Sequence, residues 1–254
     1  MALALAGCAS GDPLTNELLT QRIAKGAPRQ SVCAISGIGD FFSVQKVGIT
    51  VFGNALDKAP IDAWGIDEFV VGKIGAQLGQ RFDVKRVAYP KGAFASLERP
   101  KSPFAESKDD RKDIVRSIVG SQKCDLVVVV TKSGSMVGDT NQVVAGLGIV
   151  DASSLIFTDN VWVFALSEMR VYDGQTFAVL GHKRSYTWQP TLGVVIRGPN
   201  RKVGKSGWPA SPAHAASDTR LKQATMELLG ESIAEMVAEL FPEQQGVASA
   251  RRSR

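Results

Sequence analysis

A small loop that carries two hydroxyl groups follows a strongly apolar run at residues 124–130. Ser133 and Ser135 flank Gly134 in this loop. Open α/β sheets place their ligands at such carboxyl ends of strands. If His182 approached a hydroxyl as a base, the pair could attack an acyl group, so a serine-type hydrolase is one hypothesis. The loop lacks the glycine spacing of a nucleophile elbow, which favours an ordinary turn.

The other polar motifs predict structure rather than chemistry. Only His182 and His214 are present, with no carboxylate at ligand spacing, so we expect no metal site and no cofactor. Residues 36–40 contain two glycines, but no helix clearly follows them, as a phosphate-binding loop would require. Asp67 and Glu68 are neighbours on a predicted helix and point in different directions, so we interpret them as a capping pair. We therefore expect a protein that is not an enzyme.

Two tryptophans flank a basic segment in the second half of the chain. The set that we predict as a surface contact consists of Trp188, Arg197, Arg201, Lys202, Lys205 and Trp208. Exposed aromatic rings beside arginine suit a contact with a protein or a glycan. Anchoring of the loop onto the core is the alternative interpretation.

Composition and charge describe a globular domain with a mildly basic surface. The chain has 254 residues, of which 44% are hydrophobic, and its formal net charge is +5. A chain of this size can bury a substantial core. Three positive charges lie in residues 251–254, and no basic stripe is interleaved with aromatic residues, so we expect no nucleic acid partner. The basic residues are solvated, or they attract anionic headgroups and cell-wall polymers weakly.

The amino terminus contains a short processing motif. Residues 5–8, Leu-Ala-Gly-Cys, follow an apolar start, and this segment resembles the bacterial lipobox. The resemblance implies that Cys8 takes a diacylglycerol and becomes the first mature residue, with acyl chains such as palmitate holding the protein on a membrane. Ala9, where an aspartate would imply retention in the inner membrane, favours the periplasmic face of the outer membrane.

Only seven uncharged residues precede Cys8, whereas a full signal has a basic region and a longer apolar core. We therefore expect the natural start to lie upstream. The alternative is a cytoplasmic binding domain with a fortuitous motif. Cys33 and Cys124 lie beside predicted core strands, and an envelope location would permit a disulfide between them. Two buried free thiols are the other possibility.

Strands and helices alternate in the first half of the chain. Apolar residues recur at helical spacing over 66–78 and 112–119, and Asp62 or Asp67 is expected to cap the first of these helices. The run at 124–130 is typical of a central strand that is covered on both faces. The other strands expected here are residues 30–36, 82–89 and 41–52, the last as one strand or as a bent pair of strands interrupted by Gly48.

The apolar pattern in the second half of the chain predicts a meander of strands followed by a final helix. Its expected strands are residues 143–150, 161–172 and 176–180. Asp173 and Gly174 indicate a hairpin, because a tight type I′ turn needs positive φ at both positions. Residues 187–216 predict a long basic loop, and a last helix begins at a cap formed by Ser217 or Asp218.

Five segments support a broader resemblance. They are residues 48–54 (Gly-Ile-Thr-Val-Phe-Gly-Asn), the expected helix at 66–78, residues 82–84 and 124–129, and the Asp-Gly turn at 172–176. Their order is similar to the α/β domain of envelope lipoproteins such as the curli-secretion lipoprotein, the activators of penicillin-binding proteins and the amino-terminal domain of the Tol translocation protein. In that pattern 48–54 would be a strand. Lys132 and Ser133 replace glycine positions of the family. The resemblance implies protein binding without catalysis.

These observations predict one mixed α/β domain with a single mixed β-sheet, helices packed on it, a long basic loop and a carboxyl-terminal helix. The expected segments are a truncated signal at 1–8, a linker with a short helix at 9–29, the domain at 30–242 and a disordered basic tail at 243–254. We expect a lipid-anchored envelope protein that binds an envelope protein or peptidoglycan.

Overall fold

The computed structural model describes residues 13–26, 29–48, 51–90, 92–95, 110–138, 140, 142–153, 160–185 and 196–242. The first half forms α1 (Pro13–Ala24), β1 (Ser31–Gly37), β2 (Phe41–Lys46), β3 (Ala55–Pro60), α2 (Ile66–Leu78), β4 (Asp83–Arg86) and α3 (Asp110–Val119). The second half forms β5 (Leu126–Lys132), β6 (Gly134–Met136), β7 (Val143–Ala145), β8 (Leu147–Asp151), β9 (Val161–Ala165), β10 (Ser167–Asp173), β11 (Val179–Arg184), β12 (Asn200–Lys202), α5 (Pro212–Ser217) and α6 (Thr219–Leu240). The signal predicted at residues 1–8 and the tail predicted at 243–254 lie outside the described residues.

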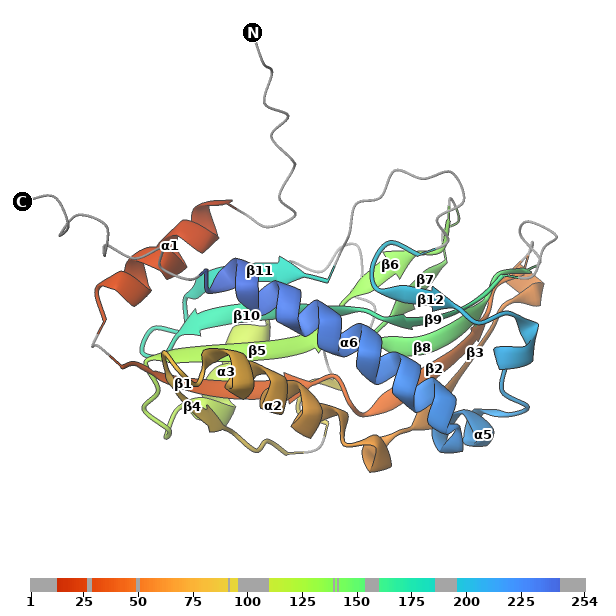
Figure 1. The fold of residues 1–254 in the computed structure, drawn as a ribbon, viewed down its shortest axis with the longest axis horizontal. Coiled ribbons are helices and arrows are strands. Elements are labelled where there is room, and N and C mark those ends of the chain that lie inside the picture. Colours follow the sequence, from red (N-terminus) through yellow and green to blue (C-terminus); the bar gives the residue numbers. More distant parts are fainter. Residues whose placement is uncertain are drawn as a thin grey trace, which may run out of the picture.

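The mixed α/β class predicted from the sequence is confirmed, but the described strands form two five-stranded sheets and a separate two-stranded pair instead of a single sheet. One sheet has the order β11-β10-β5-β1-β4, and the other has the order β12-β9-β8-β2-β3. The chain passes from one sheet to the other between β1 and β2 and again between β9 and β10 (Figure 1). The two sheets are therefore joined end to end by continuous chain segments.

The division arises where the middle strand is interrupted. β5 occupies the middle of the first sheet and β8 the middle of the second, and between them the chain forms the antiparallel pair β6–β7. Gly146, with φ of 68°, turns the chain out of β7 into β8, a conformation that glycine adopts readily. The predicted single strand at 143–150 is for this reason two strands.

One face of both sheets is covered by α2 and α6. Leu126, Val128 and Val130 of β5 lie in the main core cluster with Ile74 of α2 and Ile233 of α6. In Figure 1, α6 runs across the front of the strands of both sheets. Burial of this continuous apolar face is what fixes the register of the strands, because side chains alternate between the faces.

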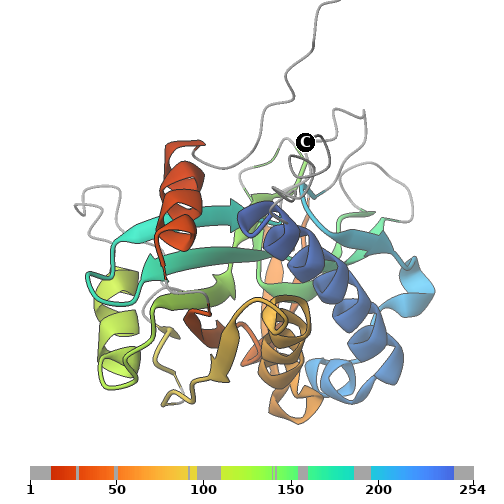
Figure 2. The same ribbon diagram turned by 60° about the vertical axis from the view of Figure 1, so that its left-hand side comes forward.

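The opposite face is covered by different elements in each sheet. Val127 and Val129 of β5 pack with Val115 and Val119 of α3 in a second cluster. Figure 2 shows α3 and α6 on opposite sides of the strands. At the other end, Val144 of β7 belongs to a third cluster on the second sheet. As expected, β5 is a central strand that is covered on both faces.

Two local predictions for the first half are wrong. Residues 41–52 form neither one strand nor a bent pair: the only strand described there is β2, a 3₁₀ turn follows at Val51–Gly53, and the chain returns as β3 after residue 52. The described part of 48–54 therefore does not form the strand that the family pattern implies. The sequence does not predict β3, because this strand lies at the edge of its sheet with mostly exposed residues and therefore lacks an apolar alternation.

The hairpin at Asp173 and Gly174 forms, but its turn is longer than predicted. Neither residue has positive φ; Phe177 does, with φ of 56°, and β11 begins only at Val179. The Asp173 carboxylate accepts hydrogen bonds from the amides of Gln175 and Thr176, which stabilises the wider turn. Gly174 is required by close approach, since an added Cβ would lie 1.7 Å from a backbone carbonyl oxygen.

The ends of the described chain pack together on the first sheet. Leu19 of α1 is fully buried, and its methyl group lies near Gly181 of β11, as does Leu240 of α6. Asp218 caps α6 by accepting from the amides of Arg220 and Leu221, which agrees with one of the two predicted caps.

A disulfide joins Cys33 of β1 to Cys124, which precedes β5. Both residues are buried in the cluster beneath α3. The bond links two neighbouring strands of the first sheet, and the cysteines are separated by 91 residues in the sequence. It therefore closes a long loop in the unfolded chain.

Replacing both Cys33 and Cys124 by alanine is expected to lower the free energy of unfolding by about 2–4 kcal/mol, because the unfolded chain gains entropy. Urea unfolding of the oxidised protein, the reduced protein and the double variant measures this difference. Cys8→Ser, which leaves the bond in place, is the control. Equal stability of the oxidised protein and the double variant would contradict the prediction.

Candidate functional site

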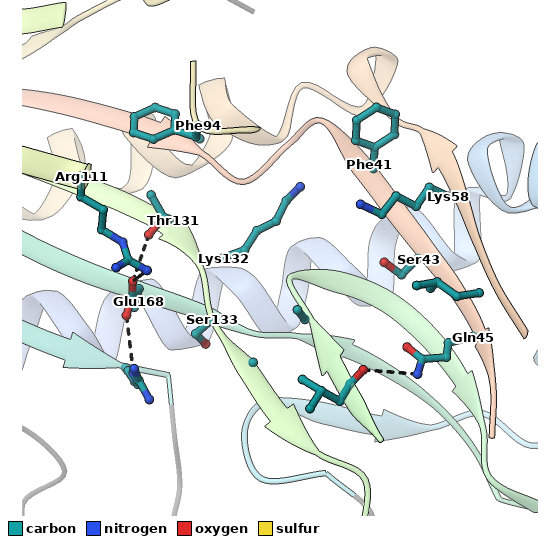
Figure 3. A pocket seen from close by; sticks show the side chains of 16 residues that line it. Phe41, Ser43, Gln45, Lys58, Phe94, Arg111, Thr131, Lys132, Ser133 and Glu168 are labelled. Carbon is teal, nitrogen blue, oxygen red and sulfur yellow. Dashed lines mark hydrogen bonds and ion pairs between the residues drawn. The ribbon is translucent and has the colours of Figure 1, made fainter. Parts of the chain in front are cut away.

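A cavity of about 360 Å³ lies where the two sheets meet, on the face opposite α2 and α6. Arg111 of α3 lines one end, and Val143 and Ala145 of β7 line the other. Figure 3 shows the side chains that point into this space from both sheets. The cavity therefore occupies the part of this face that neither α3 nor the β6–β7 pair covers.

Successive side chains of a strand point to opposite faces, and this alternation directs every second residue of β2 into the cavity. Phe41, Ser43 and Gln45 of β2 line the cavity, whereas Phe42 and Val44 between them lie in the main core. Thr131 and Ser133 at the end of β5 point to the same side. The sequence shows this alternation, but it does not reveal that β2 and the end of β5 share one cavity.

Glu168 of β10 is the buried acid of the cavity, with 1% of its side chain exposed. Arg111 lies 2.8 Å from Oε1, and the Nε2 atom of His182 lies 3.1 Å from Oε2. The guanidinium groups of Arg184 and Arg170 lie 3.5 and 3.6 Å from the carboxylate. Thr131 donates a further hydrogen bond of 3.3 Å. A buried charge requires this kind of pairing.

The electrostatics of Glu168 follow from these neighbours. Burial raises the pKa of Glu168, but the hydrogen bond from His182 and the charges of Arg170 and Arg111 outweigh it and lower the pKa to about 2. The carboxylate is consequently ionised at neutral pH and is engaged by cations. This makes it an organiser of the arginines rather than a general acid.

Two lysines lie at the centre of the cavity beside one aromatic ring. The Nζ atoms of Lys58 from β3 and Lys132 from β5 each lie 5.8 Å from the centre of the Phe41 ring. The stem of Lys132 passes over Gly146, where an added Cβ would lie 2.8 Å from its Cδ. A glycine at this turn therefore positions Lys132.

The structure does not bring together the serine and histidine side chains that the hydrolase hypothesis needs. Ser133 Oγ donates to the carbonyl of Ser167, and Ser135 Oγ donates to the carbonyl of Met136. The Nε2 atom of His182 is directed at Glu168 instead. Within the described residues, no hydrogen bond joins either hydroxyl to the imidazole, which the reaction requires.

The two-glycine segment at 36–40 forms the bend between β1 and β2. Oδ1 of Asp67 accepts from the amides of Ile38 and Gly39, each at 3.1 Å, and from the hydroxyl of Ser36 at 2.6 Å. A carboxylate of this chain thus occupies the amides that a phosphate would use.

The expectation that Asp67 and Glu68 form a capping pair, with Asp62 as an alternative cap for Asp67, is wrong. The residue before α2 is Gly65, and no side chain caps the helix. Asp67 instead fixes the strand bend and accepts from Tyr89 at 2.9 Å. Glu68 pairs with Arg86, and its own backbone amide and this arginine lower its pKa. Tertiary contacts override the local capping signal.

The predicted surface set is only partly described, since Trp188 lies outside the described residues. Arg197, Arg201, Lys202 and Lys205 are exposed. Arg201 pairs with Glu227 of α6 at 2.7 Å, and the Lys202 ammonium lies 5.9 Å from the centre of the Trp162 ring. Trp208 is half-buried and packs against the main core, as the anchoring interpretation expects. The other candidate, His214, lies exposed in α5.

Sequence reasoning missed the residues that make the cavity, namely Phe41, Lys58, Arg111, Lys132, Glu168 and Arg184. A signal for Glu168 was present: it and Arg170 alternate with the apolar residues Met169 and Val171 in a predicted strand. Charges within a strand beside the central one indicate a buried ionic network. Nothing in the sequence pairs Lys58 with Lys132.

The described residues contain no group of three or more His, Cys, Asp or Glu side chains that could hold a metal ion. In the same part of the chain, every helix is too short or too polar to cross a membrane.

Comparison with known proteins gave no match to any family model or to any curated protein sequence. Among solved structures, the carboxyl-terminal domain of LpoB from Salmonella enterica is 9% identical with a TM-score of 0.27, covering 69% of this chain and 96% of that one. The hypothetical protein CT253 from Chlamydia trachomatis is 11% identical with a TM-score of 0.33, covering 84% and 98%. Lipoprotein GNA1162 from Neisseria meningitidis is 12% identical with a TM-score of 0.27, covering 81% and 99%. These values are too low for a function to be carried over to this chain.

Glu168→Gln is expected to lower the free energy of unfolding at pH 7 by about 3 kcal/mol, because it removes the buried carboxylate that pairs the surrounding partly buried cations. A carboxylate with a depressed pKa contributes stability above its ordinary pKa of 4.5, and this stability is lost as the pH falls towards 2. The difference between the wild type and the variant should therefore shrink over that interval.

Urea unfolding of both proteins at several pH values measures this difference. Glu227→Gln, which removes an exposed carboxylate paired with Arg201, is the control and should change stability little. A difference between wild type and Glu168→Gln that does not vary with pH would contradict the assignment.

Proposed function

We propose that this chain is a lipid-anchored protein of the bacterial cell envelope that binds an envelope protein or a cell-wall component and catalyses no reaction. The observation that carries the proposal is the segment at residues 5–8, in which an aliphatic residue and two small residues precede Cys8. Acylation of this thiol would hold the domain on a membrane without a spanning helix.

The disulfide between Cys33 and Cys124 supports an envelope location independently of the amino terminus. Structural disulfides persist in the periplasm and outside the cell, and they are rare in the cytosol, where thiols are kept reduced. A cytoplasmic binding domain with a fortuitous lipobox fits this bond less well.

Two surfaces are available for a partner in this proposal. One is the rim of the cavity, where Leu56 and Val143 are more than half exposed. The other is the basic set Arg197, Arg201, Lys202 and Lys205 with the half-buried Trp208. Apolar and cationic groups side by side suit recognition of another envelope component.

Expression from the chromosomal locus tests the anchor. We expect the mature protein to begin at Cys8, to carry acyl chains by mass spectrometry and to fractionate with the outer membrane of a double-membraned host. Cys8→Ser should release it into the soluble fraction, and Ala9→Asp should move it to the inner membrane. An unacylated Cys8 with residues 1–7 retained would refute the anchor.

Photo-crosslinking in intact cells tests the binding role. A photoreactive residue in place of Lys205 or Leu56 should give a defined adduct of higher mass. The same residue in place of Glu235, which is exposed on α6, serves as the control and should give none. The absence of adducts at both test positions would count against a partner at these surfaces.

A further inference from the structure

A groove with an apolar lining follows the seam between α2 and α6 on the surface of the helical layer. Its volume is about 630 Å³, and its apolar residues are Phe69 of α2 with Met226, Gly230 and Ala234 of α6. All four are half-buried. The two helices lie side by side over the strands (Figures 1 and 2). The groove is therefore on the opposite side of the sheets from the cavity.

The seam leads from this groove to the last described residue. Phe69 lies against Gly230, where an added Cβ would be 3.1 Å from its ring, and further along the seam the rings of Phe82 and Phe241 are 5.6 Å apart. The helices thus run in the same direction. At the carboxyl end of the seam, Arg81 donates to the carbonyls of Phe241 and Pro242 at 2.8 and 3.2 Å. The chain after Pro242 therefore starts in line with the groove.

The length of chain beyond Pro242 is sufficient to reach the groove. Gly230 lies about 18 Å back along α6 from Pro242, at a rise of about 1.5 Å per residue. An extended chain covers that distance with about six residues, at roughly 3.3 Å each. Residues 243–254 can consequently fold back over the whole groove.

A row of glutamates borders the groove on α6. They recur at every fourth position, at Glu227, Glu231, Glu235 and Glu239. Arg201 and Lys183 pair with the two outer ones. Glu231 and Glu235 are exposed, and within the described residues neither makes an ion pair. Like charges four residues apart on a helix repel each other, so the middle of the row favours a cation from another segment.

The terminal segment carries the complementary groups. Its charged residues are Arg251, Arg252 and Arg254 with a single acid, Glu243, and Val247 is its one large apolar residue. Lys73 and Lys222 also line the groove, on α2 and near the start of α6. The favourable side for arginine is therefore the part of α6 that holds Glu231 and Glu235, which is also the part nearer to Pro242.

We propose that residues 243–254 fold back along the seam and cover the groove of their own chain, with Val247 against Phe69 and Ala234 and the arginines on Glu231 and Glu235. A basic segment of another protein would have to displace this tail in order to bind the groove. The inference goes beyond the proposed envelope function and does not depend on acylation of Cys8.

Paramagnetic broadening in the full chain tests the contact. The protein carries Cys8→Ser and a nitroxide on Ser253→Cys, while Cys33 and Cys124 stay bonded, so that one thiol is labelled. We expect the amide signals of Phe69 and of residues 227–235 to lose at least about half of their intensity, relative to the same sample after reduction of the nitroxide. Signals from α3, on the other face of the sheets, should keep theirs.

Glu231→Gln with Glu235→Gln should reduce this broadening at least about twofold, as should 0.5 M sodium chloride, because exposed ion pairs are screened by salt. Glu17→Gln with Asp113→Asn is the matched control. It removes two exposed carboxylates from α1 and α3 and should leave the broadening unchanged. Circular dichroism and thermal unfolding establish that both double variants are folded.

The proposal is overturned if the groove signals keep their intensity, or if the two double variants broaden equally. A mixture of isotope-labelled chain without nitroxide and unlabelled chain with nitroxide separates the two origins of a contact. Broadening in this mixture would assign the groove to the tail of a second copy and would also overturn the proposal. None of these outcomes bears on the envelope proposal, because every sample carries Cys8→Ser.

Discussion

The middle strand of one five-stranded sheet is β5 and that of the other is β8, and the chain does not run straight from one to the other. The rest of the structure depends on this interruption. The outer chain segments pass from sheet to sheet, but the middle one leaves as the β6–β7 pair and returns at Gly146. Three backbone hydrogen bonds among Ser133, Gly146 and Leu166 join the strands at the point where the chain leaves β5 for the β6–β7 pair and returns into β8. The helices can therefore cover one face continuously, whereas among the described residues the other face is covered by α3 at one end and by the β6–β7 pair at the other.

Charged residues occur within strands on the part of that face that lies between α3 and the β6–β7 pair. A carboxylate is stable in such a place only if cations surround it, and Glu168 has them from α3, β10 and β11. The same arginines then become part of the cavity wall, so that one ionic network both stabilises the sheet and sets the electrostatic character of the site. Asp67 acts similarly at the nearby bend by satisfying the amides of Ile38 and Gly39.

Elements that depend on local patterns were predictable, and those that depend on distant pairing were not. The helix at 66–78 matches α2, and the burial of β5 follows from its apolar run. β3 has no apolar alternation, and the turn after Asp173 is set by its side-chain hydrogen bonds and by Gly174 against the carbonyl of Cys124. The cavity is lined by residues as far apart in the sequence as Lys58 and Lys132, and one sequence holds no signal that they share it.

The packing of α1 limits how far the folded domain can lie from Cys8. Because Leu19 is buried against the sheet, the helix belongs to the folded body from Pro13 onwards. If Cys8 is fixed in a bilayer, the intervening chain spans at most about 18 Å even when fully extended. The tether would keep the domain at the membrane surface, with α1 nearest the lipid. Under the proposed function, such a tether would favour a partner in the same membrane, or lying directly upon it, over a distant one.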